Sequence, residues 1–231
     1  MLVGAGKTGR GLAGAALAAG LLTGCAEGAG EGAGAAASAS PSASASASAS
    51  DSAAGNGPDG AAESGGAIGV AGSACELPVT FDIAAKWEAS PVDTSAWEEA
   101  DPEVVDAVLR QGPVTAACEV NAKPAGHIGF LRVWTGKPGD DDARAVLEAF
   151  VEAGKGASRE KYRALDADGL VGAEVSYLYG HEFSDEPKKE KALAVTTPDG
   201  PVVLHLGGMD DEEHEAMLPA FELAKRTLRA L

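Results

Sequence analysis

The sequence is poor in basic residues: 18 Lys and Arg stand against 35 Asp and Glu, a formal net charge of −17. The part that follows Cys75 holds 16 of the basic and 30 of the acidic residues, a net charge of −14. A negative field of this size repels nucleic-acid phosphates and anionic lipid headgroups. We therefore expect no nucleic-acid partner and no direct electrostatic docking on a membrane.

Aromatic residues make up only 5% of the chain, and residues 26–73 contain none. This stretch consists mostly of Ala, Gly and Ser, and it buries too little apolar surface to offset its chain entropy. We expect residues 25–73 to form a disordered, flexible tether with a reach of about 40 Å. Residues 74–231 are then expected to form a single domain.

No apolar run approaches the roughly 20 residues that a membrane-spanning helix needs. Residues 1–24 are typical of a signal peptide, with a positive start and an apolar stretch over 11–22. The stretch ends in Leu22-Thr23-Gly24-Cys25, which resembles the lipobox of bacterial lipoproteins. The resemblance implies that the Cys25 thiol carries acyl chains such as palmitate, a membrane anchor on the extracytoplasmic face of the cell membrane.

Cysteine is scarce, and no CxxC spacing suggests a thioredoxin-like redox role. With Cys25 assigned to lipid, Cys75 and Cys118 remain as an even pair in an exported domain, which favours a disulfide. The alternative is two buried free thiols. Closing a loop of about 43 residues stabilises a domain by about 4 kcal/mol in the chain-entropy model.

Apolar periodicity predicts strands that alternate with helices, hence an α+β domain in which helices cover an antiparallel sheet. Acidic residues should begin each helix, because side-chain oxygens satisfy free N–H groups there. The first helix should bury Val104, Val105, Val108 and Leu109. Strands are expected over residues 77–83, 114–121, 127–135, 160–165, 171–179, 191–197 and 202–206. Helices are expected to begin at Asp101, Asp140 and Asp211. The last helix should reach Leu231, with a kink or a break at Pro219.

A family resemblance rests on the opening Val79-Thr80-Phe81-Asp82-Ile83 with Trp87. After it come a helix, a strand meander and a last helix that begins with acidic residues. The domain resembles the Mog1/PsbP-like fold and, within it, the LpqN-type lipoproteins of actinobacteria. The resemblance implies a protein that binds or assembles with partners and has no shared catalytic motif.

Few side chains carry a signal for chemistry. The histidines show no metal-ligand spacing, and the acidic runs at Asp140 and Asp210 are explained by helix capping, so we expect no metal and no cofactor. His205 alternates with Leu204 and Leu206 and should be a solvated or hydrogen-bonded residue of the opposite sheet face. Trp97, in a polar run, and His181, beside aromatic residues, are the candidate ligand or partner contacts, although a polar loop residue is the favoured interpretation of His181.

The sequence therefore predicts a membrane-anchored, non-catalytic binding module, with an envelope protein or a small ligand as its partner. Such a module should expose an apolar or aromatic patch on one sheet face and should have no convergent polar cluster. An envelope-modifying enzyme is the alternative, and it requires His127 or His181 to meet carboxylates in a pocket. A small-ligand carrier is another, and it needs an apolar cavity of roughly 300 Å³ or more between sheet and helix.

Overall fold

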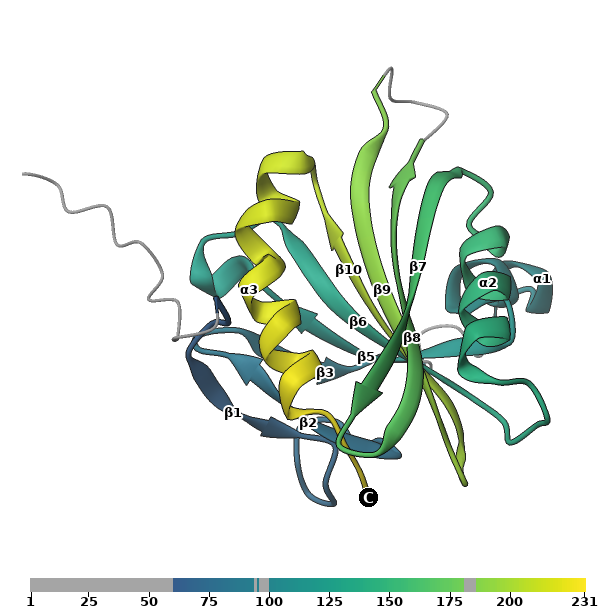
Figure 1. The fold of residues 1–231 in the computed structure, drawn as a ribbon, viewed down its shortest axis with the longest axis horizontal. Coiled ribbons are helices and arrows are strands. Elements are labelled where there is room, and N and C mark those ends of the chain that lie inside the picture. Colours follow the sequence, from purple (N-terminus) through teal and green to yellow (C-terminus); the bar gives the residue numbers. More distant parts are fainter. Residues whose placement is uncertain (1–59, 94, 96–99, 181–185) are drawn as a thin grey trace, which may run out of the picture. The chain divides into compact units, whose positions relative to one another are not determined.

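The computed structural model describes residues 60–93, 95, 100–180 and 186–231. Within them, antiparallel strands form one large and one small sheet, accompanied by three α-helices (Figure 1). The large sheet has the strand order β3-β5-β6-β10-β9-β8-β7, with β4 paired to β5. Its strands are β3 (Glu88–Pro91), β4 (Arg110–Gln111), β5 (Val114–Asn121), β6 (Gly129–Gly136), β7 (Ala157–Ala167), β8 (Leu170–Tyr179), β9 (Lys188–Thr197) and β10 (Gly200–Gly208).

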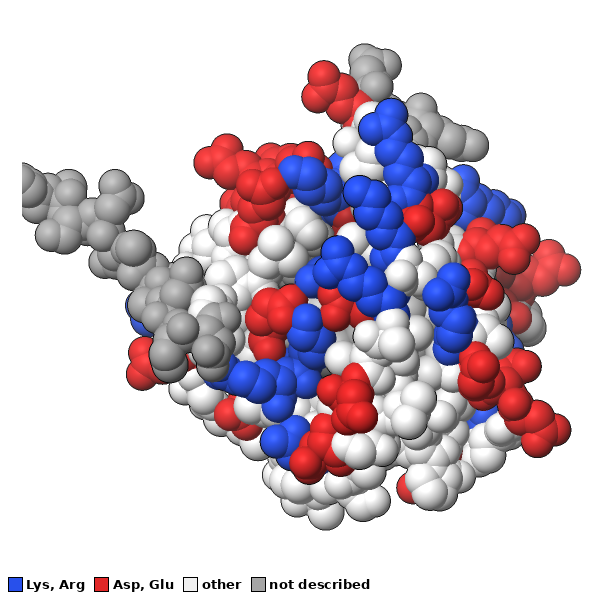
Figure 2. Space-filling view, in the orientation of Figure 1, with Lys and Arg blue, Asp and Glu red and all other residues white. Residues whose placement is uncertain are grey.

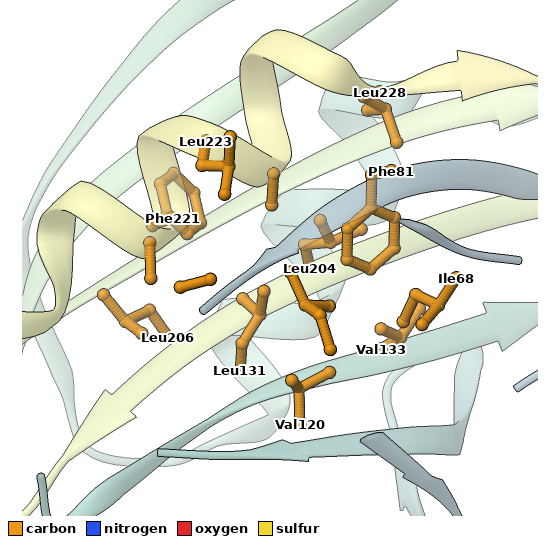
Figure 3. Close-up of a cluster of buried hydrophobic side chains, with 14 of the residues drawn as sticks. Ile68, Phe81, Val120, Leu131, Val133, Leu204, Leu206, Phe221, Leu223 and Leu228 are labelled. Carbon is orange, nitrogen blue, oxygen red and sulfur yellow. The ribbon is translucent and has the colours of Figure 1, made fainter. Parts of the chain in front are cut away.

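One face of the large sheet packs against helix α3 (Asp211–Thr227) and against the small sheet. The small sheet consists of β1 (Ser64–Ile68), β2 (Val79–Ala84) and β11 (Arg229–Ala230). Alternation places Val79 and Phe81 of β2 in the core, where both are fully buried. They meet Leu204 of β10 and Phe221 of α3 in one apolar cluster (Figure 3).

The other face packs against helix α2 (Ala143–Ala153), which buries Val146, Leu147 and Phe150 at helical spacing. Trp134 of β6 meets Phe150 edge-on, with ring centroids 5.4 Å apart. The helix begins at Asp142, two residues after the predicted cap Asp140, because the Asp142 side chain accepts the Ala145 backbone N–H. Helix α2 lies over part of this face and leaves the end near the start of β6 open (Figure 1).

The domain begins before the predicted boundary at residue 74. Strand β1 pairs with β2, and Ala62 donates a backbone hydrogen bond to the Pro219 carbonyl of α3. Residues 60–73 are thus part of the domain although they are rich in small residues, because backbone hydrogen bonds replace the missing side-chain packing.

The last helix also differs from its prediction. It runs through Pro219 and ends at Thr227, after which the chain turns into β11 instead of staying helical to Leu231. With β1 and β2, this strand makes a second sheet over the first. The expectation that helices alone cover the sheet is therefore wrong on this face.

Helix α1 (Pro102–Leu109) forms with the predicted cap, Asp101, but does not bury the predicted stripe. Leu109 is buried, whereas Val104 and Val108 are 48% and 50% exposed. The short helix leads directly into β4 and packs mainly through this last residue, which explains the difference.

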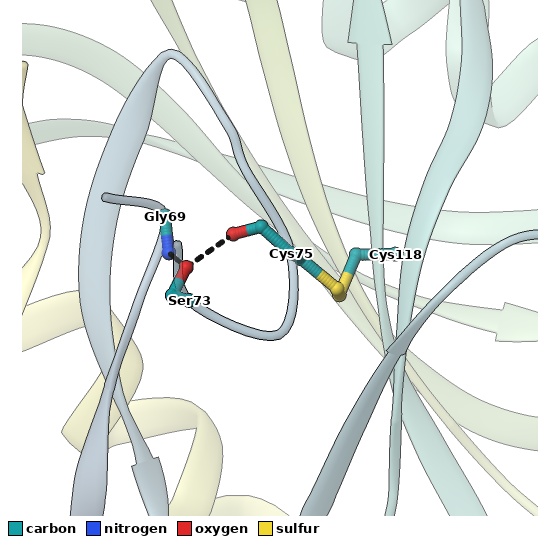
Figure 4. The surroundings of a disulfide bond; sticks show 4 residues. All are labelled: Gly69, Ser73, Cys75 and Cys118. Atoms are coloured by element: carbon teal, nitrogen blue, oxygen red, sulfur yellow. Dashed lines mark hydrogen bonds between the residues drawn. A yellow bond between two sulfur atoms is a disulfide. The ribbon is translucent and has the colours of Figure 1, made fainter. Parts of the chain in front are cut away.

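The predicted disulfide between Cys75 and Cys118 is present, with Cα atoms 6.0 Å apart and both side chains buried (Figure 4). It links the loop before β2 to strand β5, and hence the small sheet to the large one. The loop is held by Gly69, whose N–H donates to Ser73 Oγ, and Ser73 Oγ donates to the Cys75 carbonyl at 2.7 Å. Gly69 has φ +110°, and a Cβ there would clash with the Val79 carbonyl, so the turn requires glycine.

Candidate functional site

A buried polar cluster lies on the face of the large sheet that α2 covers only in part. Strand register builds it: Tyr177 of β8 stands directly opposite Glu190 of β9, and His205 of β10 stands opposite Ala192, two residues further along β9. Directly opposed residues in an antiparallel ladder share a face. Three side chains far apart in the sequence are thereby brought together.

Glu190 is the centre of this cluster, and its side chain is only 7% exposed. The Tyr177 hydroxyl donates to Glu190 Oε2 at 2.9 Å, and His205 Nε2 lies 2.9 Å from the same oxygen. Lys188 Nζ lies 3.1 Å from Glu190 Oε1 and donates to the Gly208 carbonyl at 2.6 Å. Both carboxylate oxygens therefore have partners, as a buried charge requires.

Aromatic contacts fix the His205 ring. It stacks on Tyr177 with an interplanar angle of 17°, and Phe150 of α2 meets it edge-on at 5.5 Å. His205 thus sits between the helix and the open part of the sheet.

The electrostatics follow from this geometry. Burial alone would raise the pKa of the Glu190 carboxyl, but the hydrogen bonds and charges of His205 and Lys188 outweigh it and lower the pKa to about 2. Burial, reinforced by the neighbouring Glu190 carboxylate, raises the pKa of the Tyr177 hydroxyl above its ordinary value. Glu190 is therefore a fixed negative charge at neutral pH, and Tyr177 is a fixed hydrogen-bond donor to it.

A pocket of about 370 Å³ opens beside the cluster, and we call it the His205 pocket. Its wall residues are Ile128, Gly129, Phe130, Arg132, Lys188, Glu190, His205, Gly207, Gly208 and Met209. Gly207 shares a face with His205, and a Cβ there would lie 3.7 Å from His205 Cε1 and 3.9 Å from Glu190 Oε1. A side chain at this position would therefore project into the pocket, and glycine keeps its floor open.

The pocket rim is apolar. Ile128 and Met209 are 55% and 59% exposed, among the most exposed large hydrophobic residues that the structure describes. The Met209 N–H donates to the Ile128 carbonyl, so the two rim residues are held side by side. Phe130 lies between this rim and Arg132, which pairs with Glu119. An exposed apolar rim above buried polar groups is the usual composition of a ligand-binding pocket.

The described part of the pocket wall contains no Ser, Thr or Cys that could act as a nucleophile. Nor do the residues that the structure describes include three His, Cys, Asp or Glu side chains grouped as metal ligands. What the wall offers is an apolar surface, one buried carboxylate, one imidazole, the ammonium group of Lys188 and the guanidinium group of Arg132, which is paired with Glu119. These groups suit recognition of a molecule with an apolar body and a hydrogen-bonding end.

The structure does not test the residues predicted as ligand or partner contacts. Trp97 and His181 lie outside the described residues, as does Cys25. His127 lies away from the pocket wall, with Nδ1 3.4 Å from Glu213 Oε2, so it does not supply the histidine that the enzyme alternative needs. His205 is the hydrogen-bonded sheet residue that alternation predicted.

The expectation that the module has no convergent polar cluster is wrong, because Tyr177, His205 and Lys188 meet at Glu190. Tyr177 and Glu190 were missed as members of a site. Each sits in an alternating strand segment where its polarity alone is unremarkable. Only the register of β8 with β9 and of β9 with β10 places them beside His205.

Fold and pocket together define an antiparallel α+β domain that presents one open pocket on a partly covered sheet face. The chain belongs to a family of uncharacterised lipoproteins, whose model matches residues 42–228. This confirms the prediction of a lipoprotein. Among the described residues, no helix has the length and apolarity to cross a membrane.

One similar solved structure is the solution structure of cyanobacterial PsbP from Synechocystis sp. PCC 6803, with 15% sequence identity and a TM-score of 0.44. The similarity covers 72% of this chain and 98% of that one, and at this identity it concerns the fold alone. No curated protein matches the chain.

Proposed function

We propose that this protein is a lipid-anchored, extracytoplasmic binding module, and that the His205 pocket holds its ligand. The observation that carries the proposal is the pairing of an exposed apolar rim, Ile128 and Met209, with the buried Glu190 network beneath it. A volume of about 370 Å³ suits a small molecule or one large side chain of a partner protein. The ligand would place an apolar group against the rim and a polar end near His205.

Of the two alternatives, a small-ligand carrier fits this pocket better than an envelope-modifying enzyme. Its volume of about 370 Å³ suits a small ligand, but it is an open pocket walled by strands and their adjoining loops, not the apolar cavity between sheet and helix expected of a carrier. An acyl-transfer enzyme of the usual kind needs a Ser, Thr or Cys nucleophile next to its histidine, and the described wall holds none of these three.

The anchor belongs to the same proposal. Membership of a lipoprotein family supports Cys25 as the acylated residue, and two acyl chains hold a protein stably where one does not. Replacing Cys25 with Ser should release the protein from the cell membrane or leave it unprocessed, and should abolish labelling with an alkyne-tagged palmitate. Membrane retention of an unlabelled Cys25→Ser variant would contradict the anchor.

The pocket can be tested with a photo-crosslinking amino acid at the rim. Met209 is replaced by p-benzoylphenylalanine in the full chain, and intact cells are illuminated. The matched control carries the same residue at Val171, which is 76% exposed and is not part of the pocket wall.

We expect adducts at position 209 that are absent at position 171. Mass spectrometry of the adduct separates a small ligand, which adds a few hundred daltons, from a partner protein. Equal adduct patterns at both positions, or none at position 209, would refute the pocket as the binding site.

A further inference from the structure

Basic side chains are scarce in this chain, yet they gather on one face. Figure 2 shows Lys and Arg in a band across the face on which α3 lies. We define the basic band as Arg159, Lys161 and Arg163 of β7, Lys189 and Lys191 of β9, and Lys225 of α3, which line one hollow or adjoin Glu174. The sheet face beneath this band is opposite to the one that carries the His205 pocket.

Half of the band is neutralised internally. Lys191 Nζ lies 2.9 Å from Glu174 and 2.8 Å from Glu222, and Lys225 Nζ lies 3.0 Å from Glu174. Lys189 pairs with acidic residues in the first turns of α3. These cations are already balanced and add little attraction for an external anion.

The three cations of β7 are different. Arg159, Lys161 and Arg163 are exposed, and none of them forms an ion pair with any residue that the structure describes. Strand β7 ends the large sheet, so its outer edge has no neighbouring strand among the described residues. Directly opposite Arg163 stands Glu174, but its carboxylate is shared between Lys191 and Lys225. A row of unpaired positive charge is therefore left at the most accessible edge of the fold.

Two hollows of about 410 Å³ each follow the same face. Arg159, Lys161 and Lys191 line the first hollow, and Lys225 lines the second. Ala61, one of the first described residues, also lines the second hollow. The described part of the chain therefore begins beside the second hollow, near Lys225 of the basic band.

We infer that the basic band docks the domain on the anionic lipid headgroups of the membrane that carries its anchor. The roughly 35 residues between Cys25 and Gly60 cannot extend further than about 120 Å, so an anchor at Cys25 would keep the domain near the membrane surface. Tethering supplies a high effective concentration, which makes a weak contact sufficient.

The overall negative charge does not prevent this docking. At physiological salt the Debye length is about 8 Å, so carboxylates on the far side of the domain are screened from the lipid surface. Only charges close to the headgroups count. Strand β7 contributes the three unpaired cations there, whereas Glu160 alternates to the other face and Asp166 lies towards the end of the strand, beside the second hollow. Docking by this face would turn the His205 pocket away from the lipid.

The test uses the full chain with Cys25→Ser, so that no acyl anchor contributes, and measures co-sedimentation with vesicles. One set of vesicles is pure phosphatidylcholine, and the other contains 30% phosphatidylglycerol. The ratio of the two partition coefficients isolates the electrostatic part from any apolar binding by the N-terminal segment. Because the chain is unlipidated, the docking proposal and the proposed anchor can fail independently.

A triple variant, Arg159→Gln, Lys161→Gln and Arg163→Gln, removes the unpaired cations. The matched control, Lys123→Gln, Lys137→Gln and Arg144→Gln, removes the same charge from residues outside the band. Each basic residue near an anionic surface changes partitioning by about fivefold, so the first triple should lower the ratio by up to roughly 100-fold. The control triple should change it less than threefold, and 0.5 M salt should remove the preference for anionic vesicles.

Three results would overturn the inference. The first is the absence of any preference for anionic over neutral vesicles in the Cys25→Ser chain. The second is an equal loss in both triple variants, which would mean that net charge and not the band decides. The third is full release by 10 mM inorganic phosphate or by polyglutamate at constant ionic strength, which would identify a phosphate site or an acidic partner instead of a lipid surface.

Discussion

Replacing Glu190 with Gln tests the polar cluster directly, because this change removes the buried charge and keeps the size of the side chain. The folded protein holds the pKa of the Glu190 carboxyl at about 2, below its ordinary value of 4.5, through His205 and Lys188. A difference of this size corresponds to about 3 kcal/mol of folding free energy. We therefore expect Glu190→Gln to lower the free energy of unfolding by about 3 kcal/mol at pH 7.

The sign of the pH dependence follows from the lowered pKa. The Glu190 contribution is fully present above pH 4.5 and is lost as the pH falls towards 2. The deficit of the variant should therefore shrink to about 1 kcal/mol at pH 3. Other carboxylates titrate in both proteins alike and cancel in the difference.

Urea unfolding at pH 7, 5 and 3, followed by circular dichroism, measures this deficit. Glu119→Gln is the control, because Glu119 forms a more exposed ion pair with Arg132 and its loss should amount to less than 1 kcal/mol at any pH. A Glu190→Gln deficit that stays the same from pH 7 to pH 3 would show that shape, not charge, explains the loss. Such a result would refute the electrostatic role of Glu190 in the cluster.

Two further predictions concern stability. Removing the disulfide with Cys75→Ala and Cys118→Ala should lower the free energy of unfolding, measured in urea, by about 4 kcal/mol. As a control, a reductant should destabilise the parent chain and leave this variant unchanged. A loss below about 1 kcal/mol would contradict the stabilisation expected from loop closure. Burial lowers the pKa of the His214 imidazole to about 4, so between pH 6.5 and pH 4 this residue is protonated in the unfolded chain but not in the folded one. The free energy of unfolding should therefore fall by at most about 3 kcal/mol as the pH drops from 6.5 to 4. His214→Leu should flatten urea midpoints across that window, and an unchanged slope would assign the pH dependence to other groups.

Segments with a strong apolar period were predictable. Strand β6 and helix α2 bury the residues that alternation or helical spacing selects, such as Leu131 and Phe150. In both of them, side-chain burial is the main force that fixes the structure, and burial leaves a pattern in the sequence. Strand β5 departs from simple alternation, because a bulge between Ala116 and Cys118 puts Val114 on the opposite face from Val120.

Segments held mainly by backbone hydrogen bonds were not predictable. In β1 only Ile68 is buried, and Gly65 and Gly66 give the strand the composition of a linker. Its structure comes from pairing with β2, which any small residue permits. Composition therefore placed the start of the domain too late.

The candidate site shows the same limit at longer range. Alternation alone puts His205 on the face opposite to Leu204 and Leu206, and this much was predictable. Whether it meets a carboxylate there depends on the register of three strands, since a shift of one residue would turn Glu190 to the other face. That register is fixed by the turns and by the core on both faces, not by the polar residues that form the site.

Charge poses the opposite problem, because its average is easily read from the sequence while its distribution is not. A net charge of −14 beyond Cys75 predicts repulsion from lipid at every orientation. In the fold, the acidic residues of β8 and α3 neutralise Lys191 and Lys225 and leave the three cations of β7 without partners. These ion pairs neutralise the part of the basic band on β9 and α3. The positive charge that remains in the band therefore lies on β7, at the sheet edge. Because salt screens distant charges, the local excess of positive charge on β7, and not the net charge of the domain, decides how the domain meets the membrane.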